Sequence, residues 1–588
     1  MTTTQNTSKS LRWMRARSEL AVENGTDPSR EDAVFSLQLA ESAAAKCQLD
    51  LDSPEHPLQL VIFGPTQSGK STVVNLLLET NAAGVSPLAG YTMHAQGFHV
   101  GHSGGDWLNA FFPDYKKVLV HELPRDDADC FSAEPVHSPL QPSPLTIWDS
   151  PDFDSLRAGD YRESVVRSLG LADAAMLVVS KDKYADQAVW EVLDLVRALG
   201  RPLLICVNKV ADGDRDLVVD SLLGRLDEYW GEAAKPPVVV LPWQPGLGES
   251  EPLPLDVTAL RKSVSDMLLR ASRDNHQAQL QSLLDHSWPQ WRVPLLAEVN
   301  ASQQWQTLVG QRGDSVLDQY KRDYLEHPQQ DETFQRSLVE LLQLLEIPAV
   351  ANVLGKARQL ITWPARQVFG MVGIGGESHT DPDDSLERRL LLDLFQQSLT
   401  QLSETALDRA AEGGAASVWW RAVAAHMRQQ REALSADFDQ RILSYQRAFE
   451  PEIEAAAQQM YAGLQEQPLV LNSLRAARFG ADAAGVALAV KSGGIGLIDL
   501  ALAPAMLSVT SLLTESAMGK YIDGVMRDLR ALQQQRVEQL LVQEGMATIL
   551  LALPQTLAEQ PGFYGLDQQQ YKALAEALGQ QVAESKQA

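Results

Sequence analysis

Cysteine is scarce in this sequence. Cys47, Cys130 and Cys206 are the three cysteines among 588 residues, and they lie far apart. They show neither the Cys-x-x-Cys nor the Cys–His spacing of zinc sites, which argues against a disulfide framework and against a zinc site. This usage is typical of a reducing compartment.

Positive charge is also in short supply. The chain has 50 Lys and Arg against 76 Asp and Glu, a formal net charge of -26. So acidic a chain is not expected to bind nucleic acid generally, and anionic lipid would repel it unless basic residues are concentrated locally. We therefore expect no nucleic-acid partner.

Long uninterrupted apolar runs are missing as well. The basic residues near the N-terminus are followed by the non-apolar stretch 18–24, so no secretory signal is recognisable. The longest apolar region, 481–514, is interrupted by Asp482, Lys491 and Asp499. Its uncharged part, 500–514, is shorter than the roughly 20 residues of a spanning helix. The expected location is the cytoplasm, with peripheral association at the inner face of a membrane left open.

Three kinds of pattern divide the chain. Residues 1–57 are predicted to be an N-terminal helical segment. In 58–272, short apolar runs alternate with helical stretches, which predicts an α/β domain with a mainly parallel sheet. Within it the proline-containing stretch 124–144 is predicted to be an inserted loop. From 273 to 588, apolar residues recur at three-and-four spacing, which predicts a large all-α bundle or stalk-like region.

The strongest motif is the loop at 64–71, Gly-Pro-Thr-Gln-Ser-Gly-Lys-Ser. It has the GxxxxGK[ST] pattern, preceded by an apolar strand at 58–63 and followed by a helix at 73–78. Its glycines let backbone N–H groups and the helix N-terminus point at phosphates. The pattern predicts a P-loop nucleoside triphosphatase in which Lys70 reaches the β- and γ-phosphates and Ser71 binds Mg²⁺. The residues expected to bind nucleotide in this loop are Gly64, Gln67, Ser68, Gly69, Lys70, Ser71 and Thr72.

Three later motifs follow the loop at suitable distances. Thr92 ends the loop segment 86–92, Asp149 opens Asp-Ser-Pro-Asp-Phe-Asp after a strand, and Asn208-Lys209 follows the apolar strand 202–207. With these motifs the stretch 58–241 resembles the translation-factor-related GTPases, in particular their Era-like and dynamin-like branches. The resemblance implies that GTP is the substrate and Mg²⁺ the cofactor.

The resemblance also assigns roles. Thr92 would be the switch I threonine that completes the Mg²⁺ shell, and Asp149 would hold Mg²⁺ through a water. Lys70, Thr92 and Asp149 are thus the expected catalytic residues, and Ser71, Thr92 and Asp149 the expected metal site. Asn208 and Lys209 would bind the guanine.

The sequence departs from the family pattern at three positions. Asp152 replaces a glycine next to the γ-phosphate, where a carboxylate must point away or be paired because like charges repel. Phe153 stands where Ras-like proteins carry a water-orienting glutamine, so unstimulated hydrolysis is expected to be slow. Asp212 comes one position later than the guanine-binding aspartate. Either the loop bulges so that Asp212 reaches the base, or selection for guanine is weakened.

Two segments of the helical region are candidates for lipid contact. Residues 347–376 contain no acidic residue but include basic and aromatic ones, as surface-lying amphipathic segments do. The stretch 481–514 fits either a partly inserted helical hairpin or a buried hairpin of the bundle. The favoured function is a dynamin-like or Era-like GTPase whose helical region couples nucleotide state to membrane association or self-assembly, with a homo-oligomer or a stimulating protein as partner. The alternatives are a low-turnover switch that docks a protein partner, and an ATPase.

Histidine shows no metal or triad pattern. His94, His99 and His102 fall on an expected strand and the loop after it. We expect them to be surface residues.

Overall fold

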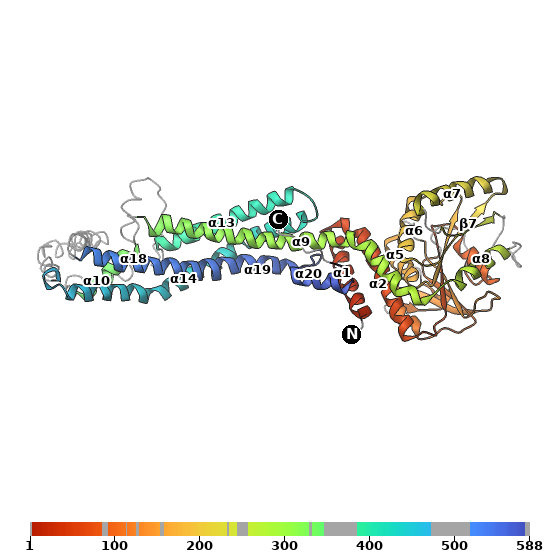
Figure 1. Cartoon of the computed structure of the whole chain (residues 1–588), viewed down its shortest axis with the longest axis horizontal. Coiled ribbons are helices and arrows are strands. Elements are labelled where there is room, and N and C mark those ends of the chain that lie inside the picture. Colours follow the sequence, from red (N-terminus) through yellow and green to blue (C-terminus); the bar gives the residue numbers. More distant parts are fainter. Residues whose placement is uncertain are drawn as a thin grey trace. The chain divides into compact units, whose positions relative to one another are not determined.

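The computed structural model in Figure 1 describes residues 3–84, 92–112, 115–124, 129–152, 158–231, 235–243, 257–327, 332–345, 385–471 and 518–581. The chain forms two compact units. The first consists of Met1–Val299 and Gln560–Ala588, and the second of Asn300–Glu559. The first unit thus contains the predicted α/β stretch 58–272 together with both ends of the chain.

A mainly parallel eight-stranded sheet, as predicted, is the centre of the first unit. Its order is β3 (Lys116–Lys117), β4 (Cys130–Val136), β2 (Gln96–Val100), β5 (Leu145–Asp149), β1 (Leu58–Phe63), β6 (Ala174–Ser180), β7 (Leu203–Val210) and β8 (Val238–Pro242). Only the β2–β5 pairing is antiparallel. Strand β4 corrects the loop prediction for 124–144. Its first four residues are buried and contain no proline, and the strand pairs with β3 through Cys130 and Phe131 and with β2 from Ser132 to Val136.

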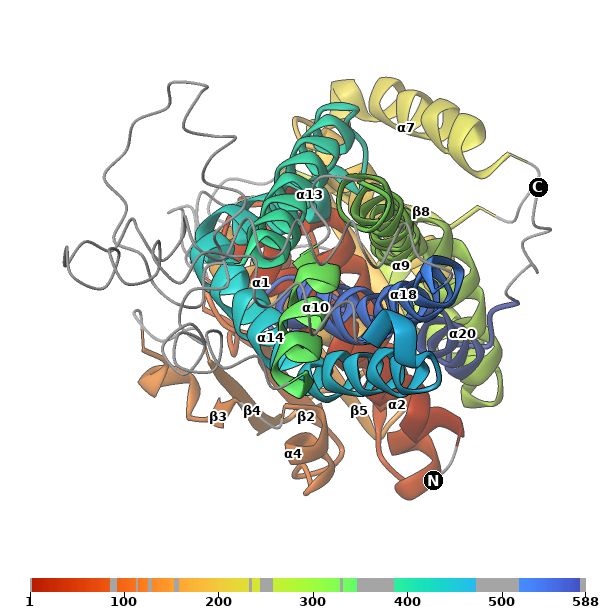
Figure 2. The same ribbon diagram turned by 90° about the vertical axis from the view of Figure 1, so that its left-hand side faces the viewer.

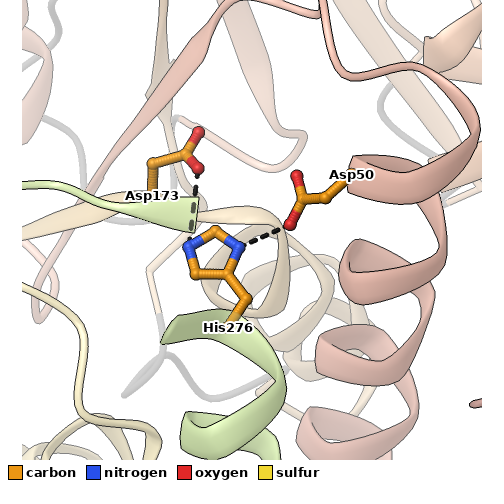
Figure 3. A group of neighbouring side chains, drawn as sticks. All are labelled: Asp50, Asp173 and His276. Atoms are coloured by element: carbon orange, nitrogen blue, oxygen red, sulfur yellow. Dashed lines mark hydrogen bonds and ion pairs between the residues drawn. The ribbon is translucent and has the colours of Figure 1, made fainter. Parts of the chain in front are cut away.

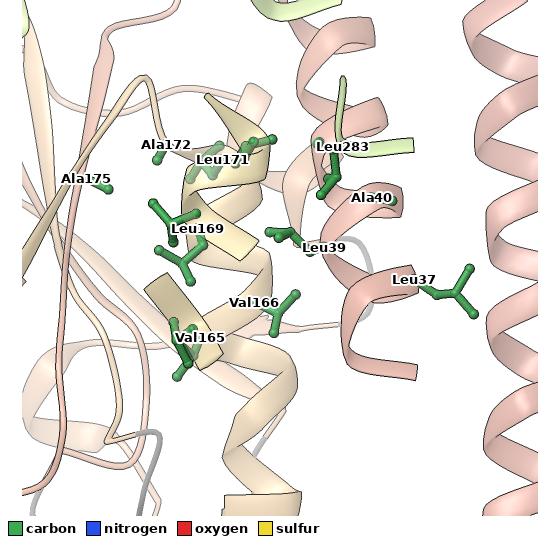
Figure 4. Packing of buried hydrophobic residues seen from close by; sticks show 14 of the residues in the cluster. Leu37, Leu39, Ala40, Val165, Val166, Leu169, Leu171, Ala172, Ala175 and Leu283 are labelled. Carbon is green, nitrogen blue, oxygen red and sulfur yellow. The ribbon is translucent and has the colours of Figure 1, made fainter. Parts of the chain in front are cut away.

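Both faces of the sheet are covered, which explains the nearly continuous apolar runs of its strands. Side chains alternate along β1, so that Leu60 and Ile62 enter one core and Val61 and Phe63 the other. Helices α3 (Lys70–Leu78) and α8 (Thr258–Leu269) line the first core. The second core is lined by α2 (Glu31–Asp52), α5 (Ala158–Leu171), α6 (Gln187–Leu199) and α7 (Arg215–Trp230). Figure 4 shows α2 packed on α5 there.

The two ends of the chain belong to the first unit because buried contacts join them. Arg30 is 4% exposed, and it donates hydrogen bonds to Asp27, to Glu298 and to the carbonyl of Gly562. Glu298 in turn accepts the backbone N–H of Tyr564. Helices α1 (Thr3–Glu23) and α20 (Gln568–Ala577) and the first part of α9 (His276–Tyr320) therefore pack with the α/β domain. The remaining short elements are α4 (Trp107–Phe111) and the 3-10 turns η1 (Pro28–Arg30), η2 (Val120–Glu122), η3 (Asp212–Asp214) and η4 (Arg273–Asn275).

The second unit is helical, as predicted. It contains the rest of α9, η5 (Lys321–Leu325), α10 (Glu332–Leu344), α13 (Leu386–Ala411), α14 (Ser417–Gln465), α18 (Gly519–Arg536), η6 (Val537–Met546) and α19 (Ala547–Ala558). Figure 2 shows α10, α13, α14 and α18 side by side. Aromatic residues fill its core: Phe395 stacks on Phe438 with ring centroids 4.2 Å apart, and Trp305 packs edge-on against Trp420.

A buried polar network joins four helices of this unit at the carboxylate of Glu387. Its Oε1 accepts hydrogen bonds from the Tyr320 hydroxyl at 2.7 Å, the Tyr445 hydroxyl at 3.1 Å and Gln533 Nε2 at 2.8 Å. Glu332 lies beside it and is 8% exposed. Burial and the charge of Glu387 raise the pKa of Glu332 to about 7.

Among the residues described, one continuous helix, Gly519–Ala558, has the length and composition that could cross a membrane. Core helices of soluble proteins can have the same length and composition. Leu541, Leu550 and Leu553 of this helix are buried. The indole of Trp305 donates to the carbonyl of Leu550 at 3.0 Å. The predicted lipid-contacting segments 347–376 and 481–514 lie outside the described residues.

Candidate nucleotide-binding site

The phosphate-binding loop connects the end of β1 to the start of α3. Gln67 and Gly69 have φ values of 61° and 91°, so the backbone passes twice through the left-handed region before the helix begins at Lys70. Alternation of this kind turns successive N–H groups toward one point and forms a concave anion site. The first turn of α3, with Ser71 and Thr72, adds the N-terminal N–H groups of a helix.

Two glycines of the loop are required by close contacts. A Cβ at Gly64 would lie 2.1 Å from the carbonyl oxygen of Val178 on β6. A Cβ at Gly69 would lie 2.3 Å from Nδ2 of Asn208 on β7. The loop is thus pressed against the carboxyl ends of two neighbouring strands, where ligands of open α/β sheets bind.

Lys70 is buried at the base of the loop. Its ammonium donates to the carbonyls of Gly64 at 3.0 Å and Pro65 at 3.3 Å and forms an ion pair with Asp152. Lys70 is 4% and Asp152 8% exposed. The carboxylate that stands in place of the family glycine is therefore paired, and its partner is the lysine expected to contact the phosphates.

Three oxygen-bearing side chains gather next to Lys70. The Ser71 hydroxyl donates to Asp149 Oδ2 at 2.6 Å and lies 3.3 Å from the Thr92 hydroxyl. Asp149 is fully buried, and its Oδ1 has no hydrogen-bond partner among the described residues. Burial raises the pKa of Asp149 to about 6, while the Ser71 hydrogen bond and the Lys70 charge oppose the rise. An orphaned carboxylate oxygen beside two hydroxyls fits Mg²⁺, which prefers oxygen ligands.

The predicted base-binding residues lie on the other side of the loop. Asn208 Nδ2 donates to the carbonyl of Ser68 at 3.0 Å, and Lys209 Nζ donates to that of Gln67 at 2.7 Å. Between Val207 and Val210, β7 has one residue more than its partner β8, so the strand bulges at Asn208-Lys209. The extra residue of the bulge lies upstream of the late Asp212. Asp212 begins η3, and its side chain lies outside the described part of the chain.

Comparison with known proteins agrees with this geometry. Residues 59–209 match a protein-family model described as 50S ribosome-binding GTPase. This segment is a P-loop GTPase domain. No curated protein sequence matched the chain.

Among solved structures, an Era variant from Aquifex aeolicus bound to GDP·AlF4⁻ is 16% identical, with a TM-score of 0.24. The match covers 36% of this chain and 56% of the Era chain, so this chain spans little more than half of that protein's length. A member of an oligomerised bacterial dynamin pair is 12% identical over 90% of this chain and 94% of its own, with a TM-score of 0.33. The LeoA bacterial dynamin GTPase from ETEC is 12% identical over 93% and 98%, with a TM-score of 0.24.

Two of the three histidines expected at the surface, His94 and His99, are buried, contrary to the prediction, and His102 is half-buried. His99 is fully buried and His94 is 3% exposed. His99 is buried because β2 lies inside the sheet rather than at its edge. The hydroxyl of Thr146 lies 3.1 Å from His99 and also contacts His102. Burial and the nearby His102 lower the pKa of His99 to about 3.

A second polar cluster in the unit that contains the GTPase domain was not visible in the sequence, because its members are more than 100 residues apart. Figure 3 shows His276 between Asp50 and Asp173, with ring nitrogens 2.5 Å and 3.7 Å from the two carboxylates. Their spacing would admit a metal ion. However, Lys46 lies 3.1 Å from Asp173 and 3.2 Å from Asp50, and Arg273 lies 3.3 Å from Asp173. Since two cations already neutralise the two carboxylates, the cluster is an ion-pair network that joins α2, the connection from α5 to β6, and the start of α9.

Proposed function

We propose that this chain is a Mg²⁺-dependent GTP-binding protein that hydrolyses GTP to GDP and phosphate. The observation that supports this most directly is the convergence of Ser71, Thr92 and Asp149 beside the anion-binding loop. These three residues would hold Mg²⁺, which supplies charge neutralisation on the phosphates.

The chain's own groups would do the rest. The loop N–H groups cradle the phosphates, and Lys70 exchanges its pairing with Asp152 for the β- and γ-phosphates. Asn208 and Lys209 already brace the loop from the base side, and the bulge in β7 is the arrangement that would let Asp212 accept hydrogen bonds from guanine.

Unstimulated hydrolysis is proposed to be slow. Asp152 engages the lysine that stabilises charge on the transferring phosphoryl group. Phe153, which cannot orient a water, lies outside the described residues. The Lys70–Asp152 pair also favours the second candidate function, a low-turnover switch that docks a protein partner through its helices.

Affinity and turnover with GTP and ATP test the nucleotide assignment. GTP should bind and be hydrolysed slowly, ATP should compete about 100-fold less well, and Lys70→Ala should abolish both binding and turnover. Lys262→Ala is a matched control, because Lys262 is an exposed lysine of α8 in the same unit. Equal competition by ATP would remove the guanine assignment and leave an ATPase.

We further propose that the helical unit couples nucleotide state to membrane association or self-assembly at the inner face of a membrane. One feature supports this: the absence of any carboxylate in 347–376 of so acidic a chain. Membrane association is tested by sedimentation with anionic and zwitterionic vesicles in the presence of GDP or a non-hydrolysable GTP analogue. Self-assembly is tested by sedimentation velocity without lipid. If the protein neither pellets nor changes its oligomeric state between nucleotides, the coupling proposal fails and the protein-docking switch is favoured.

A further inference from the structure

Strand β2 places a glutamine beside the carboxylate that is proposed to hold Mg²⁺. In the antiparallel pairing of β2 with β5, Gln96 lies directly opposite Asp149. Directly opposed residues of an antiparallel pair project from the same face of the sheet, with Cβ atoms about 5 Å apart. Gln96 therefore belongs to the surroundings of Asp149, although no motif of the sequence indicated it.

The face that these two residues share is the one that carries the proposed metal site. Ile147 of β5 and Phe98 of β2, which come two positions from Asp149 and Gln96 along their strands, enter the core that α3 lines. Asp149 and Gln96 continue these two rows by one step toward the phosphate loop. On this face the Ser71 hydroxyl, from the first turn of α3, donates to Asp149.

The amide oxygen of Gln96 is buried and unsatisfied. Gln96 is 8% exposed, and its Oε1 has no hydrogen-bond partner among the described residues. Ser132 of β4 lies beside Gln96 on the other side, but its hydroxyl oxygen is also buried without a partner in that part of the chain. Leaving a buried acceptor unpaired costs about 1–3 kcal/mol. We therefore expect a bound group that donates a hydrogen bond next to Gln96.

Asp149 has the same requirement. Its Oδ2 accepts the Ser71 hydroxyl, while its Oδ1 is buried without a partner among the described residues. A carboxylate oxygen and an amide oxygen are both acceptors, so the two cannot satisfy one another. A water molecule bound to Mg²⁺ has two hydrogens to donate, and Mg²⁺ in proteins usually keeps several of its waters.

We propose that Gln96 is a positioning residue of the Mg²⁺ site, and that its amide oxygen accepts a hydrogen bond from the same metal-bound water as Asp149 Oδ1. This role rests on the proposed Mg²⁺-dependent binding of GTP. Thr92 lies four residues before Gln96 in the chain. The segment that leads into β2 would therefore contact the metal site at both of its ends.

The Mg²⁺ dependence of nucleotide binding tests this role without a measurement of hydrolysis. The release rate of a fluorescent GDP analogue from the full-length protein is followed at buffered Mg²⁺ concentrations, and its affinity without metal is measured in EDTA. Gln96→Met has a similar size but no amide oxygen. It should need about tenfold more Mg²⁺ for half-maximal retention of the nucleotide, the usual cost of losing a residue that orients metal ligands. Its affinity in EDTA should equal that of wild type.

A conservative variant should rescue the requirement for Mg²⁺. Gln96→Glu, measured at pH 8, keeps an acceptor oxygen at the same distance from the backbone. It should therefore need no more Mg²⁺ than wild type.

A buried glutamine of the neighbouring strand β1 is the matched control. Gln59 lies beside Trp148 on the opposite face of the sheet, and its amide accepts from the indole of Trp148 and donates to the carbonyl of Pro57. Gln59→Met should lower the melting temperature, because it leaves these groups unpaired, but should not change the Mg²⁺ requirement. Metal-free Gln96→Met should melt no lower than wild type, because the amide oxygen that it removes has no partner among the described residues.

The outcomes separate this role from the proposed function. If wild type binds GDP no more tightly with Mg²⁺ than in EDTA, the proposed Mg²⁺-dependent binding fails and this role fails with it. If wild type responds to Mg²⁺ but Gln96→Met needs no more of it, or Gln96→Glu is weakened as much as Gln96→Met, this role alone is overturned. Should Gln96→Met not fold, Gln96→Asn decides: its oxygen is drawn back by one methylene, so it should need more Mg²⁺, and a wild-type requirement would overturn the proposal.

Discussion

Replacing Asp152 by asparagine should tighten the binding of GTP. In the structure the carboxylate of Asp152 pairs with the ammonium of Lys70, and both groups are at least nine-tenths buried, so solvent screens the pair weakly. A nucleotide that uses Lys70 must break this pair before it gains its own contact. The asparagine variant removes that competition and keeps the size of the side chain.

The size of the effect follows from the interaction that is lost. Hydrogen bonds to charged groups contribute about 1.5–3 kcal/mol, which corresponds to roughly 10-fold to 100-fold in affinity. A γ-phosphate charge about 5 Å from Asp152 would add repulsion of about 3 kcal/mol at an effective dielectric of about 20. GTP should therefore gain more than GDP, because GDP lacks the γ-phosphate.

Fluorescence titration with labelled GTP and GDP analogues measures both affinities. Asp220→Asn, an exposed α7 aspartate, is the matched control for loss of one negative charge. Unchanged or weaker GTP binding by Asp152→Asn would refute the competition argument.

Two further outcomes are expected. Gly69→Ala should abolish nucleotide binding, because its Cβ would lie 2.3 Å from the Asn208 amide at a φ of 91°, whereas Gly224→Ala, with open space around it, should bind normally in the same titration. The pKa of Glu332 is raised from 4.5 to about 7, so its protonated form stabilises the helical unit below pH 4.5 and this contribution, about 3 kcal/mol, is lost as the pH rises through 7. Glu332→Gln should therefore raise the melting temperature at pH 8 and flatten its dependence on pH. Glu404→Gln, on the exposed face of α13, is the control and should do neither. Parallel pH profiles of the melting temperature for wild type and Glu332→Gln would contradict this.

The parts of this structure that depend on residues close together in the chain could be predicted from the sequence. Residues 58–71 combine an apolar run, spaced glycines and a Lys-Ser pair within a few positions, so strand, loop and helix could all be predicted. The parallel sheet could be predicted for the same reason, because buried central strands are apolar throughout.

What could not be predicted depends on partners distant in the chain. Strand β4 is hidden among prolines, because its place in the sheet depends on pairing with β2. The burial of His99 follows from the position of β2 between two other strands. The Asp50–Asp173–His276 cluster arises from side chains that only the folded chain brings together.

The return of the chain to its first unit has a practical consequence for preparing that unit alone. A fragment that stops at Val299 would omit residues 560–588. Arg30 would then lose its bond to the Gly562 carbonyl, and Glu298 would lose the N–H of Tyr564. Deleting 300–559 and joining Val299 to Gln560 through a short flexible linker keeps these contacts, so the excised protein should be soluble where the simple truncation aggregates.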